Sequence, residues 1–343
     1  MTQPQSGEGR PPFQQLHDDT IPEGRPQVTA EQLAAQMRET VDKLLRDNAS
    51  RGDMKLINTA LKELRYCFKA LAPLKNRPKV TVFGSARLPP SDPSFQIAVE
   101  YGRRMAEAGY MVITGAASGI MEAGHVGAGR ENSIGINIML PWEQHANSII
   151  DGDAKLMNLK YFFTRKLLFV KEASAVALFP GGFGTQDEGW EVLTLVQTGK
   201  SHLFPIVMLD TPGSDYWTRW QDYVTGVLLA RKLISPEDLS LYRITATVDE
   251  AVEEVLRFYR VYHSMRYVGR DLVLRLRKPL PETLLASLPQ DFADILVSGT
   301  FTQGKADPIE GDEFPDMTRL RLHFNRRNMG RLRQLVDRIN TMQ

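Results

Sequence analysis

The sequence has few residues that could form a disulfide, anchor the chain in a membrane or bind a metal. Cysteine occurs once, at Cys67, so no disulfide can form within the chain. No apolar run reaches the ~18 residues that a membrane-spanning helix needs, and no basic stretch followed by an apolar core opens the chain as a secretory signal would. The six histidines are scattered, without a pair at zinc-ligand spacing. We therefore expect a cytoplasmic protein with no membrane contact and no metal.

Neither sign of charge dominates the composition. The 343 residues include 42 Lys and Arg and 41 Asp and Glu, which gives a formal net charge of +1. A chain so balanced has no strong long-range attraction to nucleic acid, so we expect no nucleic-acid partner and only local anion sites. The length and the 42 % of hydrophobic residues suit about two globular domains.

The first 77 residues divide into two segments. Residues 1–28 are rich in Gln, Pro, Gly and acidic residues and have no apolar periodicity, which predicts a disordered arm. Residues 29–77 contain two stretches, 33–45 and 54–71, in which apolar residues recur every three or four positions. This spacing predicts an N-terminal segment of two amphipathic helices.

From residue 78 to 260, short apolar runs bounded by Gly, Pro or Asp alternate with helix-like stretches. Such runs are typical of a parallel sheet that is buried on both faces. We therefore predict an α/β domain with a doubly wound, Rossmann-like parallel sheet, in which ligands bind beyond the carboxyl ends of the strands. The predicted strands are 80–83, 110–114, 134–140, 175–179 and 205–209.

Residues 261–343 show a different pattern, which predicts a small C-terminal α+β unit. Leu272, Leu274 and Leu276 alternate with other side chains as in a strand, and so do Leu320, Leu322 and Phe324. The sequence closes on a helical pattern at 332–339. Between these elements, residues 307–316 predict an acidic loop.

Arginines are concentrated in this C-terminal unit, and they allow two interpretations. They form either a basic patch that meets nucleic acid or a polyphosphate effector, or a solvated face that is paired with acids such as Asp312 and Asp316. The arginines are Arg319, Arg321, Arg326, Arg327, Arg331, Arg333 and Arg338.

The most informative segment follows the predicted strand 175–179 and opens an amphipathic helix. It places three glycines and a threonine in one turn, with Glu188 just beyond them. Glycines let a ligand approach the backbone closely, and free N–H groups at a helix start favour a phosphate. The simpler alternative is a tight strand-to-helix turn with Glu188 favourably placed in the first helical turn. The segment includes Gly181, Gly182, Phe183, Gly184 and Thr185.

Two further turns follow predicted strands and should lie at the same edge of the sheet. One contains Gly84 and Ser85, and the other runs from Gly115 through Ser118 and Gly119 to Met121. Either turn alone is as consistent with helix packing as with ligand binding. Three such turns at one edge favour a mononucleotide site.

A pair of cations, Arg165 and Lys166, follows an aromatic run before the strand 175–179. Arginine offers a planar fork to a carboxylate or phosphate, and lysine offers a point charge. An isolated pair of this kind is also common on the solvated face of a helix.

Taken together, these motifs resemble the LOG ("Lonely Guy") family. Pro180 to Glu188 matches the PGGxGTxxE signature of that family, and Arg165-Lys166 matches the Arg-Lys pair that precedes it. The resemblance extends over residues 79–256 and includes Glu143. Many relatives carry a "lysine decarboxylase" label, but nothing in this sequence marks a lysine that binds pyridoxal phosphate, so we expect no cofactor.

The resemblance implies a phosphoribohydrolase, which cleaves the N-glycosidic bond of a purine nucleoside 5′-monophosphate to free base and ribose 5-phosphate. The base is either plain or N6-modified as in cytokinins. The resemblance implies that Arg165 and Glu188 are catalytic, and that Glu143, Lys166, the 182–185 backbone and Thr194 line the nucleotide pocket. It also implies a homodimer or a higher assembly.

The chain departs from the short family members at several positions. A common triple glycine is Gly115-Ala116-Ala117 here, and Phe183 stands where tyrosine is common. The added N- and C-terminal segments are the largest departure. They leave open a second function class, a non-catalytic nucleotide sensor or nucleotide-cofactor carrier, although the Arg165 and Glu188 pair favours the enzyme.

Overall fold

The computed structural model describes residues 28–140, 145–310 and 314–342. The predicted arm at 1–28 lies outside the described residues except for Val28, and the predicted site residue Glu143 lies outside them as well. None of the described helices has the length and apolar character that would let it cross a bilayer.

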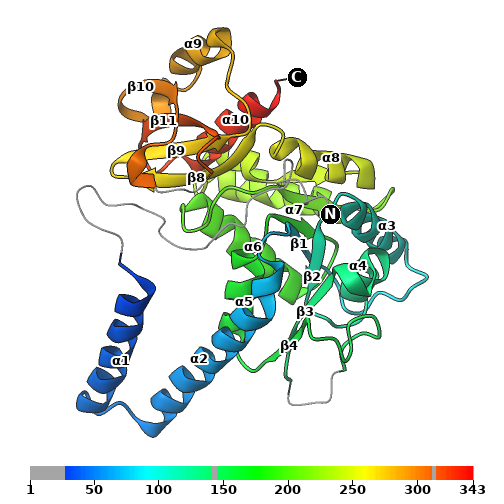
Figure 1. Cartoon of the computed structure of the whole chain (residues 1–343). Helices are drawn as coiled ribbons and strands as arrows, with labels where there is room; N and C mark the ends of the chain where they lie inside the picture. Colours follow the sequence, from blue (N-terminus) through cyan, green and yellow to red (C-terminus); the bar gives the residue numbers. More distant parts are fainter. Residues whose placement is uncertain (1–27, 141–144, 311–313, 343) are drawn as a thin grey trace, which may run out of the picture.

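The main sheet has seven parallel strands in the order β4-β3-β2-β1-β5-β6-β7, which confirms the predicted fold class (Figure 1). The sequence did not predict β4 and β7. Both lie at sheet edges, where a strand needs fewer apolar residues, and β4 includes exposed Asn158. The strands are β1 (Lys79–Phe83), β2 (Met111–Thr114), β3 (Ser133–Ile138), β4 (Leu156–Leu159), β5 (Ala175–Leu178), β6 (Ile206–Leu209) and β7 (Arg243–Thr245).

Helices cover both faces of this sheet, because successive strand residues point to opposite faces and both sets are apolar. One core joins alternate strand residues to α3 (Pro93–Glu107), α4 (Ile120–Ala128) and α8 (Val248–Phe258). The other core joins the remaining strand residues to α5 (Phe162–Lys171), α6 (Phe183–Gln197) and α7 (Tyr216–Tyr223), which continues as a π-helical segment, Val224–Leu229.

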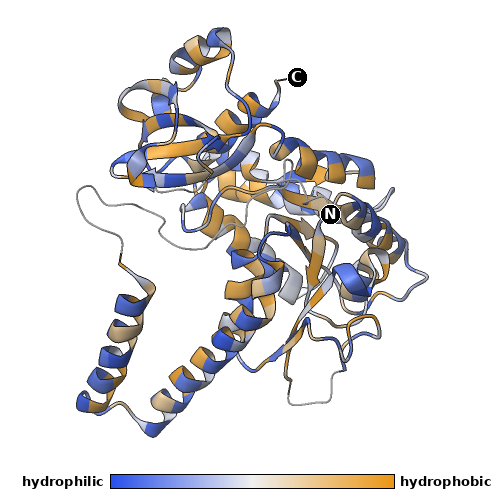
Figure 2. Ribbon diagram, viewed as in Figure 1, coloured by the Kyte–Doolittle hydropathy of each residue, from blue (hydrophilic) through white to orange (hydrophobic). Residues whose placement is uncertain are grey.

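The two predicted N-terminal helices are α1 (Ala30–Arg46) and α2 (Arg51–Leu71), and each begins with a capping box. Cys67 and Leu71 join the core beneath α5 and α6, but no residue of α1 is buried. In Figure 1, α1 and the first turns of α2 project from the body, and the colouring of Figure 2 marks apolar residues along their length. The exposed apolar residues of α1 are Leu33, Met37, Val41 and Leu45.

The C-terminal unit is an antiparallel sheet, in the order β10-β11-β9-β8, with two helices. The predicted apolar faces of 272–276 and 320–324 are buried, in a core that continues into the α/β domain. The elements are β8 (Tyr262–Val268), β9 (Asp271–Leu276), α9 (Glu282–Asp291), β10 (Leu296–Gly304), β11 (Thr318–Phe324) and α10 (Met329–Asn340). Short 3-10 segments are Ala72–Leu74, Arg130–Asn132, Pro236–Leu241, Ala293–Ile295 and Pro308–Glu310.

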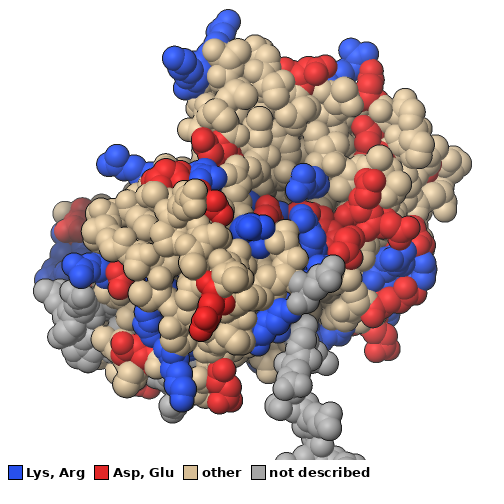
Figure 3. Space-filling view, turned by 90° about the horizontal axis from the view of Figure 1, so that it is seen from above, with Lys and Arg blue, Asp and Glu red and all other residues tan. Residues whose placement is uncertain are grey.

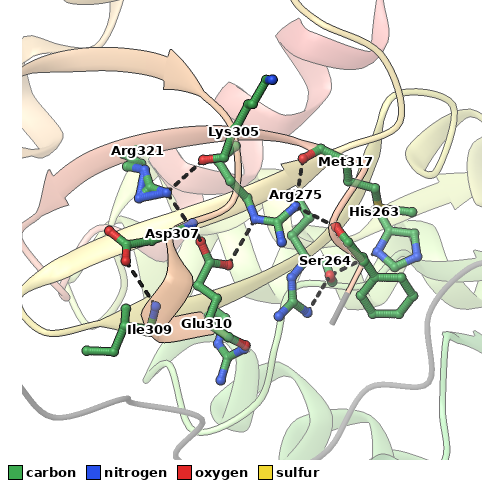
Figure 4. Close-up of polar contacts among 12 residues, drawn as sticks. His263, Ser264, Arg275, Lys305, Asp307, Ile309, Glu310, Met317 and Arg321 are labelled. Carbon is green, nitrogen blue, oxygen red and sulfur yellow. Dashed lines mark hydrogen bonds and ion pairs between the residues drawn. The ribbon is translucent and has the colours of Figure 1, made fainter. Parts of the chain in front are cut away.

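Both interpretations of the C-terminal arginines are wrong for Arg319 and Arg333, which are buried. Arg319 is paired at 2.9 Å with Glu310. Glu310 also pairs with Arg321 at 3.3 Å, as Figure 4 shows. Arg333 pairs with Glu254 of α8. The acidic loop packs Glu310 against the sheet, so the Glu310 carboxylate neutralises Arg319 and Arg321 inside the C-terminal unit. On the face seen in Figure 3, basic and acidic side chains are interspersed.

Candidate functional site

The three glycine-containing turns meet where the strand order of the main sheet reverses, between β1 and β5. This is the place where open α/β sheets bind ligands. The first turn connects the other two: the Ser85 N–H donates to the Pro180 carbonyl at 3.1 Å, and the Ser85 carbonyl accepts from the Ile120 N–H at 2.9 Å. Ser118 donates from Oγ to the Ala86 carbonyl at 2.8 Å. The structure therefore brings Gly84, Ser85 and the other two turns together, and it uses Ser118 to join them.

Two glycines in the second turn have close neighbours, and at Gly119 the neighbour is backbone that cannot shift cheaply. At Gly119, which has a φ of +67°, an added Cβ would lie 2.3 Å from the Ser85 carbonyl oxygen. At Gly115, an added Cβ would lie 2.3 Å from Nη2 of Arg165 and 2.8 Å from Sδ of Met121. The second turn is thus the surface on which the Arg165 guanidinium rests, with Met121 beside it.

A buried polar network holds the backbone of the two alanines of this turn, Ala116 and Ala117. Ala116 has a φ of +62°, a conformation that costs about 1–2 kcal/mol for a residue with a Cβ. Asn147 donates to the carbonyls of Ala116 and Ala117 at 3.1 and 3.2 Å. Asn147 also contacts His125, whose pKa burial lowers to about 4, so the imidazole is neutral at pH 7. These bonds offset the strain and fix the turn.

Glu188 lies in the second turn of α6 and is only 7 % exposed. In the part of the chain that the structure describes, Oε2 of Glu188 accepts no hydrogen bond. Its nearest cation is Lys166, whose Nζ lies 3.7 Å away. Burial raises the pKa of Glu188 to about 7, although Lys166 and Arg165 oppose the shift. At neutral pH the carboxyl group is therefore poised between its two protonation states.

The start of α6 lacks a side-chain cap. Gly182 is the N-cap residue, and no side chain accepts from the first N–H groups of this helix among the described residues. Helix starts of this kind bind anions, because the N–H groups and the helix dipole both favour negative charge. Phe183, the first residue of the helix, is 97 % exposed. Gly182 and Gly184 are exposed as well, so the turn is open to solvent.

Arg165 and Lys166, in the first turn of α5, point to different partners. Arg165 packs against Gly115 and lies 5.0 Å from the ring centroid of Phe169. Burial lowers the pKa of Arg165, and its Nε makes no hydrogen bond within the described chain. Lys166 contacts Asp187 at 2.8 Å and Glu191 at 2.5 Å. Since the Lys166 side chain is 15 % exposed, the pair is not a solvated helix face.

The family comparison matches this same region. Residues 114–255 match the model of a family described as "possible lysine decarboxylase". This segment is a LOG-family domain. The match includes Arg165, Lys166 and the turn from Gly181 to Glu188, whereas the turn at Gly84 precedes it.

Among solved structures, the LOG domain region is similar to TM1055, a structural genomics target, with 27 % identity over 51 % of this chain and 96 % of that chain, at a TM-score of 0.37. It is also similar to the molybdenum cofactor carrier protein of Chlamydomonas reinhardtii, with 19 % identity over 52 % of this chain and 99 % of that chain, at a TM-score of 0.35. A molybdenum cofactor binding protein of Rippkaea orientalis gives 21 % identity over 52 % and 94 %, at a TM-score of 0.35. The comparison with curated proteins gave no match.

A residue outside the LOG domain supports the helix that carries Arg165. Glu63 of α2 is buried and accepts from the Lys160 N–H at 2.6 Å and from Oγ1 of Thr164 at 2.7 Å. Since α5 has no side-chain cap of its own, Glu63 supplies the carboxylate at its start. The sequence pattern does not predict this role. The sequence shows only that Glu63 lies beside the apolar stripe of α2, and this position does not reveal which residues it contacts.

One predicted site residue of the LOG domain lies apart from the others. Thr194 is six residues beyond Glu188 on α6, about 9 Å farther along the helix axis. It is exposed, and its hydroxyl donates to the Trp190 carbonyl at 2.7 Å. No group of three His, Cys, Asp or Glu side chains that could hold a metal was found in residues 28–140, 145–310 and 314–342.

The raised pKa of Glu188 makes a prediction about stability. Between its ordinary value of 4.5 and about 7, the folded state binds more protons than the unfolded state. The free energy of unfolding therefore falls as pH rises through this window. We expect the uncharged Glu188→Gln variant to exceed the wild type in Tm at pH 8 by about 2 °C or more, with a smaller difference at pH 4.5, by calorimetry.

Glu253→Gln is the control for this comparison, because the Glu253 side chain is 61 % exposed. Its Tm should follow that of the wild type at both pH values. A Tm difference for Glu188→Gln that does not change with pH would contradict the raised pKa.

Proposed function

We propose that the protein hydrolyses the N-glycosidic bond of a purine nucleoside 5′-monophosphate and releases the free base and ribose 5-phosphate. The observation that carries the proposal is the buried Glu188 carboxyl group, which feels the charges of Lys166 and Arg165 and lies one turn beyond the uncapped start of α6. The LOG-family domain over 114–255 supports it.

The phosphate of the substrate fits the start of α6. The backbone from Gly182 to Thr185 offers N–H groups to an anion, and the glycines leave room for it to approach. This contact would hold the ribose near Glu188, one turn farther along the helix. The phosphate is remote from the glycosidic bond that breaks. Its binding energy serves to hold the ribose and this bond in the orientation that the reaction needs.

Glu188 supplies the chemistry that the reaction needs. As the C1′–N bond breaks, its electron pair leaves with the base and positive charge develops on the ribose. A carboxylate beside the sugar stabilises that charge, orients the hydroxyls or removes a proton from the water that attacks C1′. The base gains a proton as it departs. Arg165 contributes charge neutralisation at the phosphate or at the departing base.

The assay incubates purified protein with AMP and with N6-isopentenyl-AMP, without added metal or cofactor, and measures free base by chromatography. We expect base release by the wild type and a loss of about 100-fold or more in Glu188→Ala. Comparison of the two nucleotides tests whether the base is plain or N6-modified.

The matched control is Glu191→Ala on the same helix, which removes a partner of Lys166 but leaves Glu188 in place. It should retain most of the activity. Equal rates in the wild type and Glu188→Ala would contradict the role of Glu188.

The second candidate function, a nucleotide sensor or carrier, is favoured by the segments added on both sides of the LOG domain, and it predicts tight nucleotide binding with no base released.

We also propose a homodimer through the N-terminal helices. Isolated amphipathic helices are marginal in water, and α1 exposes an apolar stripe without burying any residue. The stripe contains Met37 and Val41, and α2 exposes Ile57 and Leu61 as well. A second copy would cover it with its own equivalent surface.

Light scattering after size-exclusion chromatography tests this proposal. The wild type should show twice the chain mass of 38.7 kDa, and Met37→Glu/Val41→Glu should show the chain mass itself. Arg38→Ala, on the polar face of α1, should behave as the wild type. A monomeric wild type at micromolar concentration would contradict the dimer.

A further inference from the structure

Tyr216 contacts the phosphate-binding turn from outside the sequence motif. It is the first residue of α7, and its hydroxyl donates to the Gly181 carbonyl at 2.5 Å. The same hydroxyl accepts from Nε2 of Gln186 at 2.7 Å. Because the Gln186 amide donates to it, the phenol directs its own proton toward Gly181. The three residues form a chain of hydrogen bonds across the base of the turn.

This chain completes the anchoring of the turn's carbonyl groups. The Pro180 carbonyl accepts from the Ser85 N–H at 3.1 Å, and the Gly182 carbonyl accepts from the Gln186 N–H at 3.1 Å. Tyr216 engages the remaining carbonyl between them. Since a peptide group is planar and trans, the direction of the Gly181 carbonyl fixes the opposite direction of the Gly182 N–H. Tyr216 thus determines where that N–H points.

A peptide between two glycines needs such an anchor. Glycine has the widest range of backbone conformations, so the Gly181–Gly182 peptide rotates more easily than any peptide flanked by larger residues. The surroundings of Gly182 are open, and an added Cβ there would meet no atom within 4 Å. On the Gly181 side an added Cβ would lie 2.1 Å from Oγ1 of Thr185, so packing limits that glycine. On the open Gly182 side, the hydrogen bond to Tyr216 restrains the peptide.

Tyr216 is itself held in place at the end of β6. Its ring packs edge-on against Trp217, with 4.8 Å between centroids. Trp217 donates from its backbone N–H to Asp210 at 3.1 Å and from Nε1 to the Leu209 carbonyl at 2.9 Å. The anchor on the turn is therefore fixed to the neighbouring strand.

We propose that Tyr216, oriented by Gln186, is a positioning residue that holds the Gly182 N–H toward the substrate phosphate. The inference rests on the proposed function, because it assigns the start of α6 to the phosphate. It predicts that Tyr216 affects affinity for phosphate-bearing ligands and has little effect on the bond-breaking step.

The test measures binding of AMP, ribose 5-phosphate and adenosine to the wild type and Tyr216→Phe by calorimetry. The phenylalanine keeps the ring against Trp217 and removes only the hydroxyl. We expect Kd for AMP and for ribose 5-phosphate to rise about fivefold, with no change for adenosine. KM for AMP should rise by a similar factor, with kcat within about twofold of the wild type.

Two further variants make the test specific. Tyr242→Phe removes a comparable hydrogen bond, the 2.7 Å bond to Gln221, from a ring packed edge-on against Trp220, and it should leave phosphate binding unchanged. Gln186→Leu should weaken AMP binding less than Tyr216→Phe, and the double variant should be no weaker than Tyr216→Phe alone, because both residues act on one peptide.

The outcomes separate this inference from the proposed function. If the wild type binds neither AMP nor ribose 5-phosphate, the proposed function fails. If the wild type binds both and Tyr216→Phe binds them equally well, the positioning role is overturned. An equal loss for adenosine would also overturn it, since adenosine has no phosphate.

Discussion

The cost of burying the Glu188 carboxyl group is the constraint on which the arrangement of the site depends. Burial raises its pKa to about 7, and Lys166 and Arg165 bring favourable charge to it. Both cations must therefore be held in place by other parts of the structure. Gly115 provides the surface for Arg165, Asp187 and Glu191 hold Lys166, and the start of α6 has no side-chain cap.

The segments outside the LOG domain share its core. Glu63 of α2 supports the start of α5, and the buried Arg333 of α10 pairs with Glu254 of α8. The apolar core is continuous from α5 and α6 into the C-terminal sheet. A change in either segment would therefore reach the helices that carry Arg165 and Glu188 through direct contacts.

The sequence predicts those parts of the fold and of the site that depend on residues close together in the chain. Buried parallel strands have short apolar runs, and a strand followed by glycines places a turn at the binding edge, so the sheet and its three turns were predictable. Glu63 was not, because its partners Lys160 and Thr164 lie 97 and 101 residues away and leave no local pattern. Tyr216 contacts Gly181 across 35 residues for the same reason. Arg319 and Arg321 form part of an alternating pattern that is the same for a solvated face and for a face covered by Glu310.

The central claim is that the buried carboxylate of Glu188 acts in glycosidic cleavage, and the pH dependence of kcat/KM for AMP tests it most directly. The wild-type value should rise about tenfold per pH unit below pH 7 and level off above it, because the ionised form is the active one. Glu188→Gln, measured in parallel, shows how ionisation of the substrate phosphate alone changes kcat/KM. Its profile should lack the rise that ionisation of Glu188 causes in the wild type. A wild-type profile of the same shape as that of Glu188→Gln would contradict the account.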